Sequence, residues 1–137
     1  MIDWTTLRSA AQAAMGRAYA PYSSYPVGAA LMCEDGTVVT GCNVENASYP
    51  AGICAERTAV AAAVAQGHRR FARLAICTGS GPVASPCGIC RQVLMEFAPS
   101  LEIVSFTVDG REASWTLASL LPAPFVLESH DRTSGVA

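Results

Sequence analysis

Residues 27–43 read VGAALMCEDGTVVTGCN, and this stretch decides the fold class. Its first part, residues 27–33, is an apolar run typical of a buried strand, and the turn-forming residues Glu34-Asp35-Gly36 follow it directly. Residues 37–43 then return as a second strand. The stretch therefore predicts a β-hairpin with one strongly buried strand.

Helical patterns lie on both sides of this hairpin. Apolar residues at helical spacing predict a first helix over residues 4–19, which Pro21 ends. A second helix is expected from Cys54 through an alanine-rich stretch to Gln66, with Gly67 as its C-terminal stop. The order helix, strand, strand, helix is typical of an α/β protein.

The rest of the chain continues this alternation. Strands are expected over residues 74–78 and 102–108, separated by a loop and a helix over residues 87–97. Ser85-Pro86 resembles an N-cap followed by proline at the first helical position of that helix. Residues 114–121 are expected as a short helix. Strands interleaved with helices predict an α/β layer architecture around a mixed sheet.

The chain of 137 residues has the length of a single domain. We expect this domain over residues 1–128 and a polar, mobile C-terminal tail over residues 129–137. Apolar residues make up 51% of the chain and charged residues 15%, which is more apolar than an average soluble domain. This surplus favours an oligomer over a monomer, although an alanine-rich core would also explain the apolar count.

Charge and hydropathy exclude several classes of partner. A formal net charge of −2 provides no basic footprint for a nucleic acid. No apolar run approaches the roughly 20 residues that a membrane span needs. Residues 1–4 show no secretory signal, so we expect a cytoplasmic protein in a reducing compartment, where disulfides are rare.

The cysteines outside the motifs are expected to be structural. Cys33, Cys42 and Cys77 lie in apolar, strand-like segments, where free cysteine behaves as a small buried hydrophobe. The only histidines, His68 and His130, sit in no motif, and both are expected at the surface.

The other three cysteines have the spacing of a metal site. Cys87 and Cys90 stand three apart at a helix start, which places both sulfurs on one face within reach of a single ion. Cys54, at the start of another helix, would add a third thiolate. Three protein ligands leave tetrahedral zinc with one open position, the arrangement of a catalytic site. The helix N-termini would help to hold the sulfurs as thiolates.

Glu56 strengthens the catalytic interpretation. A carboxylate two residues after a ligating thiolate is well placed to shuttle protons for a metal-activated water. A lone Cys-x-x-Cys would also fit a redox pair or structural zinc, and Glu56 alone would also fit a solvated carboxylate in a first helical turn. The combination of Cys54, Glu56 and Pro86-Cys-x-x-Cys is the signature of zinc deaminases, here with cysteine ligands only.

Three runs resemble the small, homotetrameric, zinc-dependent cytidine deaminases: CAERTA at residues 54–59, PCGICRQ at 86–92 and GCNVENAS at 41–48. The similarity covers nearly the whole chain, from Pro21-Tyr22-Ser23 to Phe125. It implies a three-layer α-β-α fold with a mixed, mostly five-stranded sheet, and a homotetramer whose sites are completed by neighbouring subunits.

The resemblance also implies an activity. Members of this family hydrolyse cytidine and deoxycytidine to uridine and deoxyuridine with release of ammonia, in pyrimidine salvage. It implies one zinc ion per subunit, held by Cys54, Cys87 and Cys90. Zinc-bound hydroxide would attack C4 of the base, while Glu56 moves protons to N3 and to the departing amine.

Asn43 and Glu45 stand two apart at the end of a strand, so their side chains project from one face and suit bidentate recognition of a sugar hydroxyl. The resemblance assigns the same pair to the ribose. Without it, the run Asn43 to Asn46 would also fit a turn.

The resemblance implies roles for several more residues. Arg57 would hydrogen-bond the ligating sulfurs and draw charge from a three-thiolate site, although it would also fit an ordinary surface arginine of a helix. Tyr25 and Phe125 would place rings against the pyrimidine, or else pack in the core. Ala55 would offer backbone groups to the base edge, and Tyr49 would reach a neighbouring subunit's site.

Two other functions stay open at this point. The first is a deaminase for another aminated pyrimidine or for a nucleoside antibiotic of the blasticidin type, against which the run Asn43 to Asn46 favours plain cytidine and deoxycytidine. The second is a zinc-stabilised binding module without catalysis. Such a module would not require Glu56, and on RNA it would carry a basic groove with exposed aromatic rings.

Overall fold

The computed structural model describes residues 3–127. Its described part holds one five-stranded sheet in the order β2-β1-β3-β4-β5, with helices between the strands. The elements in chain order are α1 (Trp4–Met15), β1 (Val27–Cys33), β2 (Val38–Cys42), the short 3₁₀ helix η1 (Tyr49–Ala51), α2 (Ala55–Ala65), β3 (Phe71–Thr78), α3 (Gly88–Phe97), β4 (Glu102–Thr107), β5 (Glu112–Thr116) and α4 (Leu117–Leu120).

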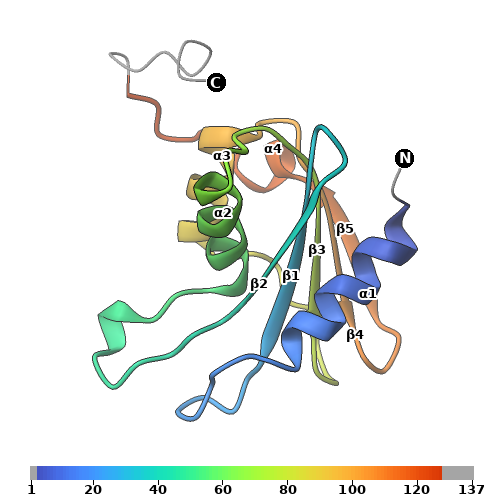
Figure 1. The fold of residues 1–137 in the computed structure, drawn as a ribbon, viewed down its shortest axis with the longest axis vertical. Helices are drawn as coiled ribbons and strands as arrows, with labels where there is room; N and C mark the ends of the chain where they lie inside the picture. Colours follow the sequence, from blue (N-terminus) through green and yellow to red (C-terminus); the bar gives the residue numbers. More distant parts are fainter. Residues whose placement is uncertain (1–2, 128–137) are drawn as a thin grey trace.

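The sheet is mixed. Strand β1 pairs antiparallel with β2 and β3, β3 pairs parallel with β4, and β4 pairs antiparallel with β5. A parallel pair needs a crossover connection, and α3 supplies it between β3 and β4 (Figure 1). This topology confirms the predicted mixed, five-stranded α/β sheet.

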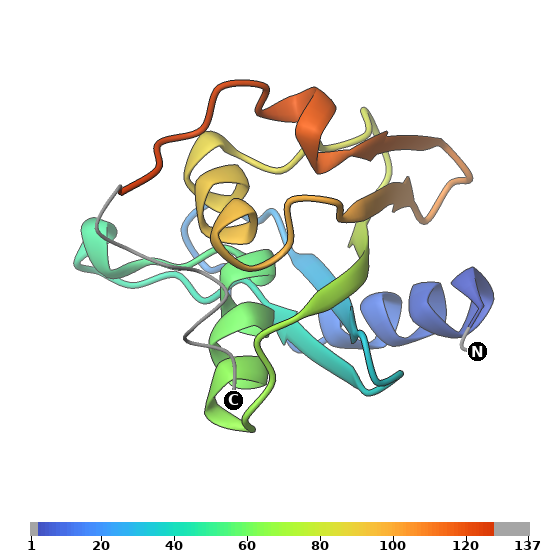
Figure 2. The same cartoon turned by 90° about the horizontal axis from the view of Figure 1, so that it is seen from above.

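Helices cover both faces of the sheet (Figure 2). On one face, Leu7 and Ala11 of α1 pack with Ala30, Ala75 and Phe106 of the strands. On the other face, α2, α3 and α4 close a second and larger core cluster over β1, β3 and β4. The three-layer α-β-α arrangement is therefore confirmed.

Two glycines allow the helices to approach the sheet closely. A Cβ on Gly41 of β2 would lie 2.4 Å from the backbone nitrogen of Ala59 and 2.6 Å from the carbonyl oxygen of Ala55. A Cβ on Gly28 of β1 would meet the backbone of α1 in the same way, 2.0 Å from the oxygen of Ala11. Since backbone atoms cannot yield as a flexible side chain can, Gly41 sets how deeply the first half of α2 sits on the sheet.

The prediction of a helix over residues 114–121 is wrong in its first part. Ser114 and Trp115 pair with Val104 and Ile103 of β4, so they belong to β5. Pairing with a distant strand thus decides the conformation of residues whose local propensity is ambiguous. The half-buried Trp115 packs on the core. The helix that follows is α4, and the Thr116 hydroxyl accepts from the backbone nitrogen of Ser119 as its N-cap.

Two predicted helix ends also differ. Helix α1 ends at Met15, four residues before the predicted end, with Gly16 as its C-cap; Tyr19 instead forms a bridge with Val44. Ser85 is not the N-cap of α3, because Cys87 takes that position and its sulfur accepts from the backbone nitrogen of Cys90 at 3.5 Å.

The predicted burial is confirmed for Cys33 and Cys77, whereas Cys42 is partly exposed. His68 is not a simple surface residue, since its side chain is only 22% exposed. Gly67 adopts a left-handed backbone conformation with φ +94°, which turns His68 back toward the β1–β2 turn.

Among the described residues, no helix is long and apolar enough to cross a membrane. The predicted tail over residues 129–137 and His130 lie outside the described residues, and the single domain over residues 1–128 stays a prediction.

Candidate active site

Three cysteines meet at the N-termini of two helices. Cys54 is the N-cap of α2, Cys87 is the N-cap of α3, and Cys90 follows in the first turn of α3. These helices pack against each other on one face of the sheet (Figure 1). The backbone nitrogen of Cys90 donates to Cys87 Sγ at 3.5 Å, and the positive ends of both helix dipoles lie on the side of the sulfurs, which favours negative charge there.

The sulfur positions fit a zinc ion. All three Sγ atoms lie within 4.8 Å of one another, and those of Cys54 and Cys87 are 3.9 Å apart. Two thiolates on tetrahedral zinc, with Zn–S bonds of about 2.3 Å, would be separated by about 3.8 Å. Cys54 is half-buried, Cys87 is exposed and Cys90 is buried, and Cys54 and Cys87 line a pocket.

Hydrogen bonds already favour negative charge at this site. The Cys90 thiol and, next to it, the Arg57 guanidinium lower the pKa of Cys54 to about 5, against the opposing effect of burial. Arg57 Nη2 donates to Cys54 Sγ at 3.3 Å. The hydrogen bond between the Cys90 and Cys54 side chains, together with burial, raises the pKa of Cys90. A dication would replace the proton that the sulfurs share, because metal binding displaces thiol protons.

Glu56 lies beside the sulfurs and is 6% exposed. Burial raises the pKa of its carboxyl group, and the charge of Cys54 acts in the same direction. Glu56 also lines a pocket of about 410 Å³ together with Cys54, Ala55 and Cys87. The structure thus places the predicted acid, two of the predicted ligands and Ala55 around one cavity.

The same pocket is lined by Tyr25, Asn43 and Glu45. Asn43 binds the segment beside it: its Oδ1 accepts from the nitrogen of Val27 at 2.8 Å, and its Nδ2 donates to the oxygen of Tyr25 at 2.8 Å. Both contacts hold the segment that carries Tyr25 against the end of β2.

The Glu45 carboxylate binds the neighbouring turn. It accepts from the backbone nitrogens of Tyr22 and Ser23 at 2.9 and 3.1 Å, and from the Ser23 hydroxyl. The hydrogen bond from the Ser23 side chain, followed by the two backbone bonds, lowers the pKa of Glu45. The Glu45 carboxylate is therefore charged at neutral pH. Ser23, which also lines the pocket, received no role in the sequence analysis although the run Pro21-Tyr22-Ser23 is part of the resemblance.

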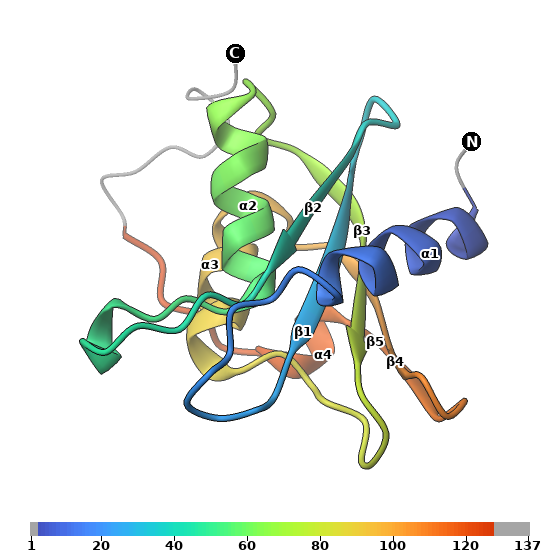
Figure 3. The same ribbon diagram turned by 60° about the horizontal axis from the view of Figure 1, so that its bottom comes forward.

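Two predicted aromatic residues lie outside the lining of this pocket. Phe125 is 69% exposed, and Gln92 holds its backbone through a pair of hydrogen bonds of 2.9 and 3.0 Å. Tyr49 is 76% exposed and makes an edge contact with Tyr22 at 5.8 Å between ring centroids. It lies on the segment between β2 and α2, which extends away from the sheet (Figures 1 and 3).

Arg91 anchors the Cys-x-x-Cys loop and was missed by the sequence analysis. Its Nε donates to the oxygen of Pro86 at 2.7 Å, Nη1 to the oxygen of Leu120 at 2.9 Å, and Nη2 to the hydroxyl of Ser85 at 3.2 Å. Its place in the run PCGICRQ was visible in the sequence, but its contact with the carbonyl group of Leu120 joins two distant parts of the chain.

A family model for the cytidine and deoxycytidylate deaminase zinc-binding region matches residues 2–106, which include Cys54, Glu56, Cys87 and Cys90. The chain belongs to this deaminase family. The cytidine deaminase of Mycobacterium tuberculosis is 45% identical over 131 residues, covering 96% of each chain. That of Sporosarcina psychrophila is 44% identical over 128 residues, covering 93% of this chain and 94% of the relative.

Solved structures agree with these matches. The crystal structure of the cytidine deaminase from Burkholderia pseudomallei has a TM-score of 0.87 and 46% identity, covering 90% of this deaminase and all of that chain. The M. tuberculosis structure has a TM-score of 0.80 and 45% identity, covering 93% and 100%. The predicted family is confirmed, and with it the zinc cofactor, for which Cys54, Cys87 and Cys90 form a fitting site.

Proposed function

We propose that this chain hydrolyses cytidine and deoxycytidine to uridine and deoxyuridine and releases ammonia. It is a zinc-dependent hydrolytic deaminase by family, and its relatives of 44–45% identity are named cytidine deaminases. The observation that carries the proposal is the buried Glu56 carboxyl group in the same pocket as two sulfurs of the zinc-fitting triad. A binding module would not need an acid at that position.

A zinc ion held by Cys54, Cys87 and Cys90 would supply a Lewis acid that lowers the pKa of a bound water toward about 7. Glu56 is the proton carrier of the reaction. It removes a proton from the attacking water, delivers a proton to N3 of the ring, and later protonates the amine that leaves as ammonia. Because Glu56 lies in the first turn of α2, packing of that helix on Gly41 holds the carboxyl group in place.

Arg57 balances the charge of the site. Three thiolates and one Zn²⁺ sum to a net charge of −1, which weakens the ion as a Lewis acid. The Arg57 guanidinium, already at 3.3 Å from Cys54 Sγ, draws electron density from that sulfur by donating to it.

Asn43, Glu45, Tyr25 and Ala55 form the nucleoside subsite. The Glu45 carboxylate accepts a hydrogen bond from a ribose hydroxyl, Asn43 shares that hydroxyl, Tyr25 contacts the base, and Ala55 offers backbone groups to the base edge. A charged carboxylate repels phosphate, so this subsite favours a nucleoside over a nucleotide or a polynucleotide. The blasticidin-type alternative has no observation in its favour.

Replacing Glu45 with alanine is expected to raise KM for cytidine by roughly 5- to 150-fold, because the sugar hydroxyl loses a charged hydrogen-bond acceptor in the pocket. Steady-state kinetics on cytidine would measure KM and kcat separately. The control is Ser23→Ala, which removes the hydroxyl contact to Glu45 but leaves the carboxylate in the pocket. An unchanged KM for Glu45→Ala, or an equal rise in the control, would contradict a direct contact with the sugar.

The active form is a cytoplasmic homotetramer in which Tyr49 acts at the site of a neighbouring subunit and Phe125 places its ring against the pyrimidine. Support comes from their strong exposure and from that of Tyr22 and Tyr25 beside the pocket, since a small domain rarely leaves large aromatic rings in water without a partner. Native mass measured together with activity on dilution tests this assembly.

The activity itself is tested by following the absorbance of cytidine. Zinc-loaded protein is expected to convert cytidine, chelation to abolish the conversion, and one equivalent of zinc per chain to restore it. Protein with one bound zinc per chain that binds cytidine without converting it would instead support the binding module. A faster conversion of an aminated nucleoside antibiotic would support the other alternative.

A further inference from the structure

We propose that Cys33, Asp35 and His68 form a second site for a divalent transition metal of the zinc class, separate from the site of Cys54, Cys87 and Cys90. One ligand atom from each of the three residues lies within 4.8 Å of the other two. Helix α2 separates the two sites: Cys54 precedes it and His68 follows it, and its eleven residues span about 16 Å. This inference does not depend on the reaction that the other site performs.

Backbone hydrogen bonds hold the three donors in place. Cys33 ends β1 and Asp35 lies in the following turn, where the nitrogen of Gly36 donates to the oxygen of Cys33 at 2.9 Å. The nitrogen of His68 donates to the oxygen of Ala63 at 2.9 Å, which fixes the histidine at the end of α2. The backbone nitrogen of Glu34 donates to the oxygen of Arg70 at 3.0 Å, and this bond joins the turn to the loop that carries His68.

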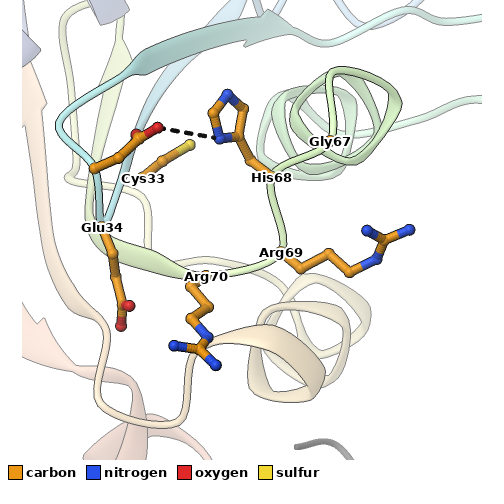
Figure 4. Close-up of a pocket in the computed structure, with 7 residues that line it drawn as sticks. Cys33, Glu34, Gly67, His68, Arg69 and Arg70 are labelled. Atoms are coloured by element: carbon orange, nitrogen blue, oxygen red, sulfur yellow. Dashed lines mark ion pairs between the residues drawn. The ribbon is translucent and has the colours of Figure 1, made fainter. Parts of the chain in front are cut away.

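The side chains are arranged around a shared space. Asp35 Oδ1 is occupied by the nitrogen of Thr37 at 3.0 Å, while Oδ2 faces His68 Nδ1 at 3.7 Å. The Cys33 sulfur points at the imidazole ring (Figure 4). The pocket that these groups line has a volume of about 350 Å³, which leaves room for a water molecule as a fourth ligand. Ligand pairs on tetrahedral zinc are about 3.3–3.7 Å apart, so a modest contraction closes the site.

The donor set fits zinc rather than a hard cation. One thiolate, one imidazole and one carboxylate are ligands that zinc accepts together, whereas Mg²⁺ and Ca²⁺ require oxygen ligands. Thiolate and carboxylate carry two negative charges, which one dication neutralises. The guanidinium groups of Arg69 and Arg70, which belong to the same pocket, point away from the sulfur and the imidazole (Figure 4).

Such a metal would act as a clamp. It would join the β1–β2 turn to the loop between α2 and β3, two segments about thirty residues apart in the chain, and stabilise the folded state by its affinity for it. Burial raises the pKa of Cys33, and the charge of Asp35 adds to this, so binding must displace the thiol proton and is weaker than at the three-sulfur site.

Metal stoichiometry tests the proposal. The full-length protein is loaded with one equivalent of zinc, dialysed against increasing free Zn²⁺, and analysed for bound metal. Two equivalents per chain are expected for the unchanged protein and one for His68→Gln and Asp35→Asn, both outside the buried core. The matched control is Arg70→Gln, an exposed residue of the same pocket, which is expected to retain two.

Thermal unfolding gives a second readout. The second equivalent is expected to raise Tm of the unchanged protein by several degrees and to leave Tm of His68→Gln unchanged. Cytidine turnover is expected to be the same in all of these proteins, which separates this outcome from a failure of the deaminase site. A single equivalent of zinc in the unchanged protein would overturn the proposal. So would a second equivalent of zinc that persists in both His68→Gln and Asp35→Asn.

Discussion

Replacing Glu56 with glutamine is expected to lower kcat for cytidine by at least about 10²- to 10⁴-fold while the protein keeps one zinc ion per chain at its three-sulfur site. Glutamine has nearly the same size and hydrogen-bonding reach, so α2 and the sulfurs of Cys54 and Cys90 stay in place. The glutamine amide cannot take up a proton and give it back at neutral pH. The step that moves protons from water to the base and to the amine is therefore lost, whereas ligation is not.

Two measurements together decide this prediction. Metal analysis reports whether the variant holds zinc, and single-turnover kinetics report the chemical step. Glu34→Gln is the matched control, because Glu34 is an exposed carboxylate in the turn after β1 and is expected to leave kcat unchanged. Substantial turnover by zinc-loaded Glu56→Gln would show that another group carries the proton.

Replacing Cys90 with serine is expected to remove both the active-site zinc and the activity. Cys90 is fully buried, so no water can take the place of its sulfur as a ligand. A serine hydroxyl is a poor zinc ligand. Its C–O bond is shorter than the C–S bond of cysteine, its oxygen is a harder ligand than sulfur, and the hydroxyl stays protonated at neutral pH. Zinc at this site is expected to fall well below one per chain, and cytidine turnover to the background rate.

The control separates loss of metal from loss of packing. Cys77 is also a fully buried cysteine, but its side chain lies in the core cluster under α1, separate from the cluster that α2 and α3 cover. Cys77→Ser is expected to lower the free energy of unfolding by about 1–3 kcal/mol, since it buries a hydroxyl in an apolar cluster, and yet to keep zinc and turnover. Zinc and activity in Cys90→Ser, or their loss in Cys77→Ser, would argue against the assigned ligand.

Much of the fold could be predicted because its signals are local. The apolar run of residues 27–33 and the turn residues after it predicted β1 with its observed bounds. The start of α2 differed from the prediction by one residue, since Cys54 caps that helix rather than opening it. Where pairing with a distant strand decides the outcome, local signals failed: residues 114–116 form β5 because β4 lies beside them.

The grouping of the three cysteines was predictable for a related reason. Cys87 and Cys90 stand three residues apart in a helical first turn, and this geometry alone brings two sulfurs to one face. The prediction added Cys54 to this pair only because the motif of Cys54 and Glu56 precedes the Cys-x-x-Cys motif in the chain. The distance between the two helix N-termini could not be predicted, because it depends on how the helices pack.

The sequence by itself determined the family, and it predicted the three cysteines and the acid that the structure brings together, since these depend on residue identity and on spacing within one helical turn. Only the tertiary structure decided that Arg57 turns toward Cys54, that Glu45 holds the turn at Ser23, and that His68 comes to face Asp35. Such contacts depend on side-chain rotamers and on backbone segments distant in the chain, and packing of the complete core selects both.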